Sequence, residues 1–196
     1  GSGAEAAASR PAGAGASAAA ARPEDGETMN KLMRILRHRW WDEADTRRLL
    51  GEDALQRLEQ RVQASEARHT GEIRLCIEGS LPMSYLWRNA DARERALTMF
   101  GKLQVWDTED NNGVLIYLLL VEHRIEIVAD RALARRVDQG QWDAIVHGMC
   151  DTFRAGRIEE GLNRAIDAVT ELLVQHFPLP AGQAGVNELA DRPHVR

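Results

Sequence analysis

The sequence predicts an α/β fold, a three-layer α/β/α sandwich with a small mixed sheet. Residues 72–78 alternate between apolar and polar side chains, which is typical of a strand. Residues 114–121 form an unbroken apolar run, which indicates a strand buried on both faces. Amphipathic helical patterns precede and follow these strands, so helices are expected to cover the sheet on both sides.

The chain has 196 residues, enough for one domain with a sizeable core. Its formal net charge of −5 argues against nucleic acid, and against an anionic membrane as the default partner. No apolar run approaches the roughly 20 residues that a membrane-spanning helix needs. Cys76 and Cys150 are isolated, so we predict no structural zinc and no disulfide framework; both are expected to be small buried hydrophobes.

Composition divides the chain into four segments. Residues 1–28 are rich in Ala and Gly and begin with a Gly-Ser cloning remnant, so we expect a disordered tail. Residues 29–46 are a basic leader, residues 47–178 are the folded domain, and residues 179–196 are expected to be a second disordered tail.

The leader mixes basic with apolar residues and leaves two interpretations open. Residues 29–41 could form an amphipathic helix that makes a peripheral membrane contact. Alternatively, the helix is structural and packs Trp40 and Trp41 onto the domain. We favour the structural interpretation because the segment is short for an independent helix.

The domain begins with a helix for which Asp53 is the expected N-cap and Gly71 the stop. The strand at 72–78 follows, with one wetter face and a place at or near a sheet edge. Residues 79–85 contain Pro82 and are expected to be a loop. A helix from Asn89 to Gly101 then leads towards the apolar strand, which suggests a right-handed crossover between the two strands.

The apolar strand and a second strand at 125–129 are separated by only a few residues, which predicts an antiparallel hairpin. A helical turn at 133–137 and helices at 141–153 and 158–176 complete the domain.

Polar side chains gather just before the first hairpin strand and just after the second. These two ends lie side by side in an antiparallel pair, so the side chains could converge. Asn112 and Gly113 are expected to adopt the positive φ of a tight turn. The candidate metal ligands are Asp107, Glu109, Asp110, Asn111, Asn112 and Asp130.

Carboxylate and amide oxygens suit a hard cation, so the expected cofactor at this patch is Ca²⁺ or Mg²⁺. The spacing does not match an EF-hand loop. On spacing alone we favour the alternative that these side chains cap backbone N–H groups in an exposed turn. No motif for a catalytic serine, a phosphate-binding loop or a zinc protease is present, and no nucleophile can be identified.

Three spaced blocks, GEIRLCIE, RERALTMFGKLQVWDTEDNNGVLIYLLL and RIEIVADR, resemble the TPM domain family, also called TPM phosphatase. The resemblance covers about residues 47–178 and is closest to a short bacterial branch without the usual signal and membrane anchor. It implies an α/β/α sandwich, and calcium binding or acid phosphatase activity as in some members. The glycine-rich segment that follows the second hairpin strand in membrane-associated members is replaced here by residues 128–133.

The resemblance therefore implies a binding or accessory module that assists a membrane-associated protein complex in the cytoplasm. The partner it implies is a LemA-like protein or a second TPM-domain membrane protein. The alternatives are a metal-dependent phosphomonoesterase and a peripheral membrane adaptor that uses the basic leader.

Overall fold

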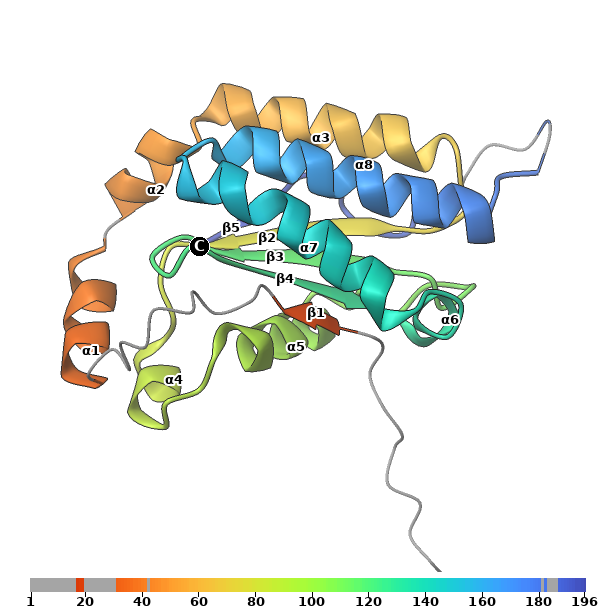
Figure 1. Cartoon of the computed structure of the whole chain (residues 1–196). Helices are drawn as coiled ribbons and strands as arrows, with labels where there is room; N and C mark the ends of the chain where they lie inside the picture. The colour runs from red at the N-terminus through yellow and green to blue at the C-terminus, as the bar shows by residue number, and fades with distance from the viewer. Residues whose placement is uncertain (1–16, 20–30, 42, 181, 183–186) are drawn as a thin grey trace, which may run out of the picture.

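The computed structural model describes residues 17–19, 31–41, 43–180, 182 and 187–196. Within them, five strands lie among eight helices along the chain (Figure 1). The strands are β1 (Ser17–Ala19), β2 (Ile73–Glu78), β3 (Val114–Leu119), β4 (Arg124–Ala129) and β5 (His194–Val195). The helices are α1 (Lys31–Trp40), α2 (Glu43–Leu49), α3 (Glu52–Glu66), α4 (Met83–Trp87), α5 (Ala92–Lys102), α6 (Arg131–Ala134), α7 (Gln139–Arg154) and α8 (Ile158–His176).

The strands form one mixed sheet in the order β1-β4-β3-β2-β5. Strands β2 and β3 are parallel and are connected through α5, whereas β3 and β4 form the expected antiparallel hairpin. The hairpin register pairs Val114 with Ala129. The first residue of β3 and the last residue of β4 therefore lie at the same end of the sheet.

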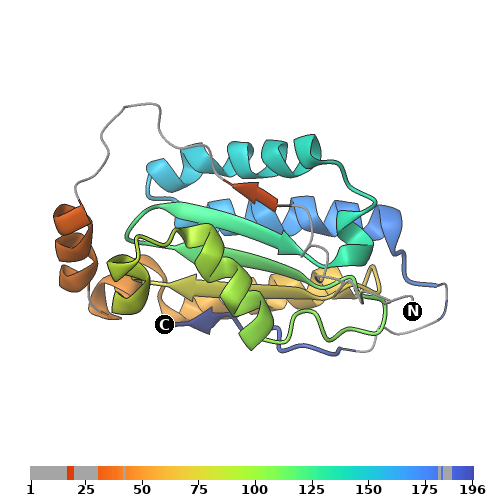
Figure 2. The ribbon, with the colours of Figure 1, turned by 90° about the horizontal axis from the view of Figure 1, so that it is seen from below.

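Helices cover both faces of this sheet, which confirms the three-layer α/β/α arrangement (Figures 1 and 2). Helices α3, α7 and α8 pack on one face, where Ile116 and Leu118 of β3 enter the larger core cluster. Helices α4 and α5 lie on the other face, where Leu115 and Leu119 enter the smaller cluster. The apolar run of β3 is thus buried on both sides because it lies in the middle of the sheet.

Strand β2 differs from the sequence prediction, because its second face is not wet. Cys76 is fully buried in the smaller cluster, where burial raises the pKa of its thiol to about 12. Glu78 is also buried, and it accepts two hydrogen bonds from Arg95 of α5. An ionic partner that comes from a helix cannot be read from alternation within the strand.

Two element boundaries also differ from the prediction. Helix α3 follows Gly51 with no side-chain cap, so Asp53 lies inside the first turn. Residues Met83–Trp87 form helix α4 rather than a loop, directly after Pro82. Proline is compatible with a helix start because the first N–H groups of a helix have no internal acceptor.

Residues 187–196 pack against the domain, whereas the sequence predicts a disordered tail at 179–196. Strand β5 pairs in parallel with β2, and Arg196 donates its N–H to the Ile77 carbonyl at 2.9 Å. The Glu72 carboxylate accepts the backbone N–H groups of Glu188 and Leu189 at 3.1 and 3.3 Å. These are backbone contacts, which the composition of the tail does not reveal.

At the other end of the chain, residues 17–19 of the expected N-terminal tail form β1 beside β4, while the rest of that tail lies outside the described residues. In the leader, Trp41 packs against both core clusters, but Trp40 is 80% exposed. The structural interpretation therefore holds for Trp41 and fails for Trp40. Among the described residues, no helix is both long and apolar enough to cross a bilayer.

Candidate functional site

The acidic turn at residues 107–113 lies beside Asp130, because β3 begins where β4 ends. The Asp130 N–H donates to the Gly113 carbonyl at 2.8 Å, and the Ala132 N–H donates to the Asn111 carbonyl at 3.1 Å. The Nε atom of Arg131 also donates to Asn111 Oδ1 at 3.0 Å. The hairpin thus makes the turn and Asp130 neighbours, and metal binding there stays a prediction.

The conformation of the turn differs from the expectation in which residue has a positive φ. Asn111 has a φ of 52°, and neither Asn112 nor Gly113 has a positive φ. Glycine is required at position 113 for a different reason. A Cβ atom there would lie 2.0 Å from the Val105 carbonyl oxygen, so only glycine lets the two backbone segments approach this closely.

Asn112 is fully buried, and its polar atoms are only partly satisfied. Its backbone N–H donates to Thr108 Oγ1 at 3.2 Å, and its side-chain Nδ2 donates to Thr70 Oγ1 at 3.2 Å. Its Oδ1 atom accepts no hydrogen bond, although it has no contact with solvent. A buried acceptor without a donor costs free energy, so this oxygen is a candidate ligand atom.

Asp130 carries a second such oxygen. It is the N-cap of α6, and its Oδ1 accepts the Arg131 N–H at 2.6 Å. The residue is 7% exposed and its Oδ2 has no hydrogen-bond partner. Burial raises the pKa of this carboxyl above its ordinary value, which the hydrogen bond from Arg131 only partly opposes. A bound cation would supply the missing compensation.

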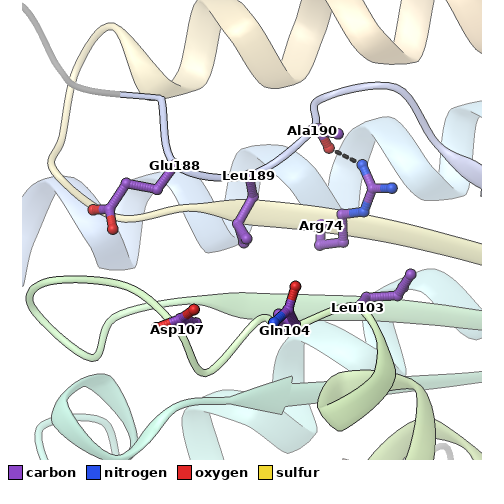
Figure 3. A pocket seen from close by; sticks show the side chains of 7 residues that line it. All are labelled: Arg74, Leu103, Gln104, Asp107, Glu188, Leu189 and Ala190. Carbon is purple, nitrogen blue, oxygen red and sulfur yellow. Dashed lines mark hydrogen bonds between the residues drawn. The ribbon is translucent and has the colours of Figure 1, made fainter.

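The other predicted ligands point to different partners. Asp110 is exposed, and its Oδ2 accepts the Thr70 hydroxyl at 3.0 Å. Glu109 donates its backbone N–H to the Glu188 carboxylate at 3.0 Å, so its loop is tied to the C-terminal segment. Asp107 lines a cavity of about 230 Å³ together with Arg74 and Glu188 (Figure 3).

The six predicted ligands therefore do not form one cluster. Within the described parts of the chain, no three His, Cys, Asp or Glu side chains are placed to hold a metal ion together. Two buried oxygens without a hydrogen-bond donor remain, Asn112 Oδ1 and Asp130 Oδ2, in the segments that precede β3 and follow β4. Since calcium also accepts amide and backbone oxygens, this pair is compatible with a weak cation site but not with a tight one.

Sequence reasoning missed three residues that shape this site. Thr70 contacts both Asp110 and Asn112, and Thr108 accepts the Asn112 N–H. Glu188 reaches the turn from the C-terminal segment. Thr108 lies within the predicted turn and could have been recognised as a capping residue. Thr70 and Glu188 approach only through tertiary structure, and no local signal marks them.

A second polar cluster lies on the α5 side of the sheet and is not accessible. Glu78, Arg95 and Tyr117 are 1%, 2% and 0% exposed, and the Tyr117 hydroxyl donates to Glu78 at 2.8 Å. Burial, together with the adjacent carboxylate, raises the pKa of the Tyr117 phenol. With all three groups satisfied and closed to solvent, this cluster supports the fold rather than chemistry.

The parallel β2–β3 pair, the β3–β4 hairpin and the flanking helices define a small α/β/α sandwich domain with its polar turn at one end of the sheet. The model of the TPM domain family matches residues 44–172, and the chain belongs to this family. No curated protein matches the chain.

Among solved structures, the chain is similar to the BA42 protein from the psychrophilic bacterium Bizionia argentinensis, whose structure was determined by NMR. The TM-score is 0.66 and the sequence identity is 23%, over 75% of this chain and 95% of that chain. At this identity the similarity shows the fold alone, and this fold agrees with the α/β/α sandwich described above.

Proposed function

We propose that this protein is an accessory binding module of the TPM family that binds a divalent cation weakly at the acidic turn. One observation carries the proposal. Two buried oxygens accept no hydrogen bond: Asn112 Oδ1, two residues before β3, and Asp130 Oδ2, directly after β4, where Val114 pairs with Ala129. Oxygens of this kind are the ligands that Ca²⁺ and Mg²⁺ prefer.

The proposed inner ligands are Asn112 and Asp130. Asp110 and Asn111 of the same turn could join them. The Asp110 side chain accepts a hydrogen bond from Thr70, and the Asn111 side chain accepts one from Arg131. The affinity is expected to be modest because a single buried carboxylate contributes, whereas tight calcium loops use several carboxylates. Asp107 and Glu109 are left out of the proposed set because their loop faces the C-terminal segment.

The module would act on a protein partner rather than on a small substrate. We propose a cytoplasmic role beside a membrane-associated complex that contains a LemA-like protein or a second TPM-domain protein. The basis is family membership, together with the absence from the sequence of a recognised motif for a catalytic nucleophile. Copurification with candidate membrane proteins, in the presence of calcium and of a chelator, would test the partner.

The cation is tested by thermal unfolding of the purified chain during titration with CaCl₂ or MgCl₂. The melting temperature should rise with cation concentration, because a ligand that binds only the native state stabilises it by mass action. Asp130→Asn keeps an oxygen for the α6 cap but removes the charge, and it should abolish the rise. Asp53→Asn removes an exposed carboxylate on α3 and should leave the rise unchanged. A melting temperature that does not change with either cation would contradict the proposal.

A metal-dependent phosphomonoesterase is the second candidate, and one observation favours it. Arg131 has a side chain that is 61% exposed and lies beside the turn, where a guanidinium could face a phosphoryl group. The test is turnover of p-nitrophenyl phosphate with and without cation. Activity that requires the cation and is lost in Asp130→Asn/Arg131→Ala would replace the accessory module by an enzyme.

A further inference from the structure

Helix α1 contacts the domain through Ile35, which packs against the smaller core cluster, and through two polar side chains, Arg34 and His38. Arg34 Nε donates to Glu122 Oε1 at 2.6 Å, and His38 Nε2 lies 2.9 Å from the same oxygen. His38 Nδ1 accepts the backbone N–H of Leu81 at 3.0 Å, and this ring is almost fully buried. The helix is therefore fixed to the β3–β4 turn by hydrogen bonds and an ion pair.

Three further apolar residues of α1 form a stripe that faces solvent. Met33, Leu36 and Trp40 follow one another at i, i+3 and i+7, so they share one face of the helix. Their exposed fractions are 60%, 37% and 80%. A surface helix normally turns such a stripe towards the core and its charges towards water. An apolar stripe that stays exposed while Ile35 of the same helix packs inward is typical of a surface that contacts another apolar surface.

Helix α4 adds to this exposed surface. Met83 and Trp87 lie one turn apart and are 40% and 65% exposed. The two helices lie side by side in both views (Figures 1 and 2). The Arg34 guanidinium of α1 donates to the carbonyl of Ala90, in the segment that follows α4, at 2.8 Å. We call the five exposed apolar residues the tryptophan surface: Met33, Leu36, Trp40, Met83 and Trp87.

Helix α1, which carries three of the five residues of the tryptophan surface, is basic, whereas the whole chain is acidic. Helix α1 contains Lys31, Arg34, Arg37 and Arg39 and no acidic residue. Arg37 and Arg39 are exposed. The net charge of −5 therefore does not exclude attraction of this helix to an anionic surface. Charges interact appreciably only within a Debye length of about 10 Å, so the charge close to the contact decides the attraction.

We propose that the tryptophan surface docks onto the headgroup region of an anionic lipid bilayer. Tryptophan favours this region because its ring is apolar and its N–H remains hydrated, and arginine next to it attracts anionic headgroups. The two helices project from one end of the sandwich in Figure 1, a shape that suits insertion into a lipid interface better than capture of a peptide.

The docking surface and the acidic turn lie at opposite ends of the sheet. The β3–β4 turn with Glu122 contacts α1, whereas residues 107–113 precede the far end of β3. A docked protein would thus direct the acidic turn away from the membrane. This inference does not depend on cation binding, and the two can fail separately.

The experiment is co-sedimentation of the full chain with vesicles of phosphatidylcholine, with and without phosphatidylglycerol. The protein should bind only the anionic vesicles, and higher salt should weaken binding. Met33→Ser/Leu36→Ser/Trp40→Ser should abolish binding. Arg37→Gln/Arg39→Gln should weaken it roughly thirtyfold, since each basic residue near an anionic surface contributes about fivefold.

Two matched controls separate this surface from general effects. Lys102→Gln/Arg135→Gln removes the same charge from exposed positions elsewhere and should bind more tightly than the Arg37/Arg39 variant. Tryptophan emission should shift to the blue with anionic vesicles, and Trp40→Phe/Trp87→Phe should lose most of that shift. Trp106→Phe, at a 48% exposed position near the acidic turn, should retain it.

Three results would overturn the proposal. The first is no binding to anionic vesicles at low salt by the unmodified chain. The second is binding that survives both the serine and the glutamine variants while their melting temperatures remain native. The third is binding to cell membranes but not to pure lipid vesicles, which would assign the surface to a membrane protein.

Discussion

Arg95 and Glu78 form a bidentate ion pair in the interior, with nitrogen-to-oxygen distances of 2.7 and 2.5 Å and exposures of 2% and 1%. The pair joins α5 to the last residue of β2. The hydrogen bonds that Arg95 donates to the Glu78 carboxylate raise the pKa of the Arg95 guanidinium. Because neither charge has contact with water, each compensates the desolvation of the other.

Removal of one partner should therefore be costly. Arg95→Leu leaves the Glu78 carboxylate buried and should lower the free energy of unfolding by about 3–5 kcal/mol in urea denaturation. Glu78→Leu/Arg95→Leu should recover part of this loss because no uncompensated charge remains. Arg61→Leu breaks the exposed pair with Asp167 and should cost no more than about 1 kcal/mol. Equal effects of the two single variants would contradict the interpretation.

A methyl group at Gly113 should disrupt the candidate site. Gly113→Ala forces the backbone away from the Val105 carbonyl and should cost at least about 1–3 kcal/mol, the usual range for overpacking. Gly101 lies in α5 with nothing within 4 Å of an added Cβ, so Gly101→Ala should stabilise the protein by about 0.5–1 kcal/mol. Thermal unfolding of the two variants should move in opposite directions.

The middle of the sheet can be tested with Leu115, which is fully buried in β3. Leu115→Ala should cost about 2–5 kcal/mol because it removes buried methyl groups and leaves a cavity. Leu97→Ala on α5 removes the same atoms from a side chain that is 36% exposed and should cost clearly less. If chemical denaturation gave equal losses, Leu115 would lie outside the core.

Glu126 predicts a pH dependence of stability. The residue is fully buried in β4, and neither carboxylate oxygen has a hydrogen-bond partner. Burial raises the pKa of this carboxyl from 4.5 to about 7. The folded state thus holds a proton that the unfolded state has already released. The contribution of Glu126 to the free energy of unfolding is fully present below pH 4.5 and is lost as the pH rises to about 7.

Glu126→Gln removes this titration while it keeps the size of the side chain. Near pH 4.5 and below, the variant and the unmodified protein should have similar free energies of unfolding. Above pH 7 the variant should be more stable by up to about 3 kcal/mol, since one unit of pKa shift corresponds to about 1.4 kcal/mol. Urea denaturation at the two pH values measures this, and an advantage that does not change with pH would argue against a proton on Glu126.

Where the sequence carries a strong local pattern, the prediction matches the structure. Helix α8 was predicted from Ile158 to His176 and has these bounds, because the apolar spacing is regular and Pro178 follows. The hairpin was predicted from one long apolar run and a short connection, and its register then makes the acidic turn and Asp130 neighbours. These features depend on residues close together in the chain.

Features that depend on distant residues could not be predicted in this way. The C-terminal segment docks through backbone N–H groups on the Glu72 carboxylate, and composition alone indicated disorder. The six predicted ligands are grouped by their place in the turn, but Asp107 lines a cavity with Arg74, and the Glu109 backbone N–H donates to Glu188 of the C-terminal segment. The buried Glu78 was expected on a wet face because its partner, Arg95, lies on another element.

The pairing of β5 with β2 has a practical consequence for handling the protein. Arg196 is hydrogen bonded through both its N–H and its carbonyl to residues Ile77 and Gly79, so residues fused after it would emerge directly from the sheet. A short affinity tag fused there would disturb these two hydrogen bonds and displace β5 from β2. Loss of the segment would leave the β2 edge free to recruit strands from other molecules, which is a route to aggregation. Purification handles are better placed at the opposite terminus.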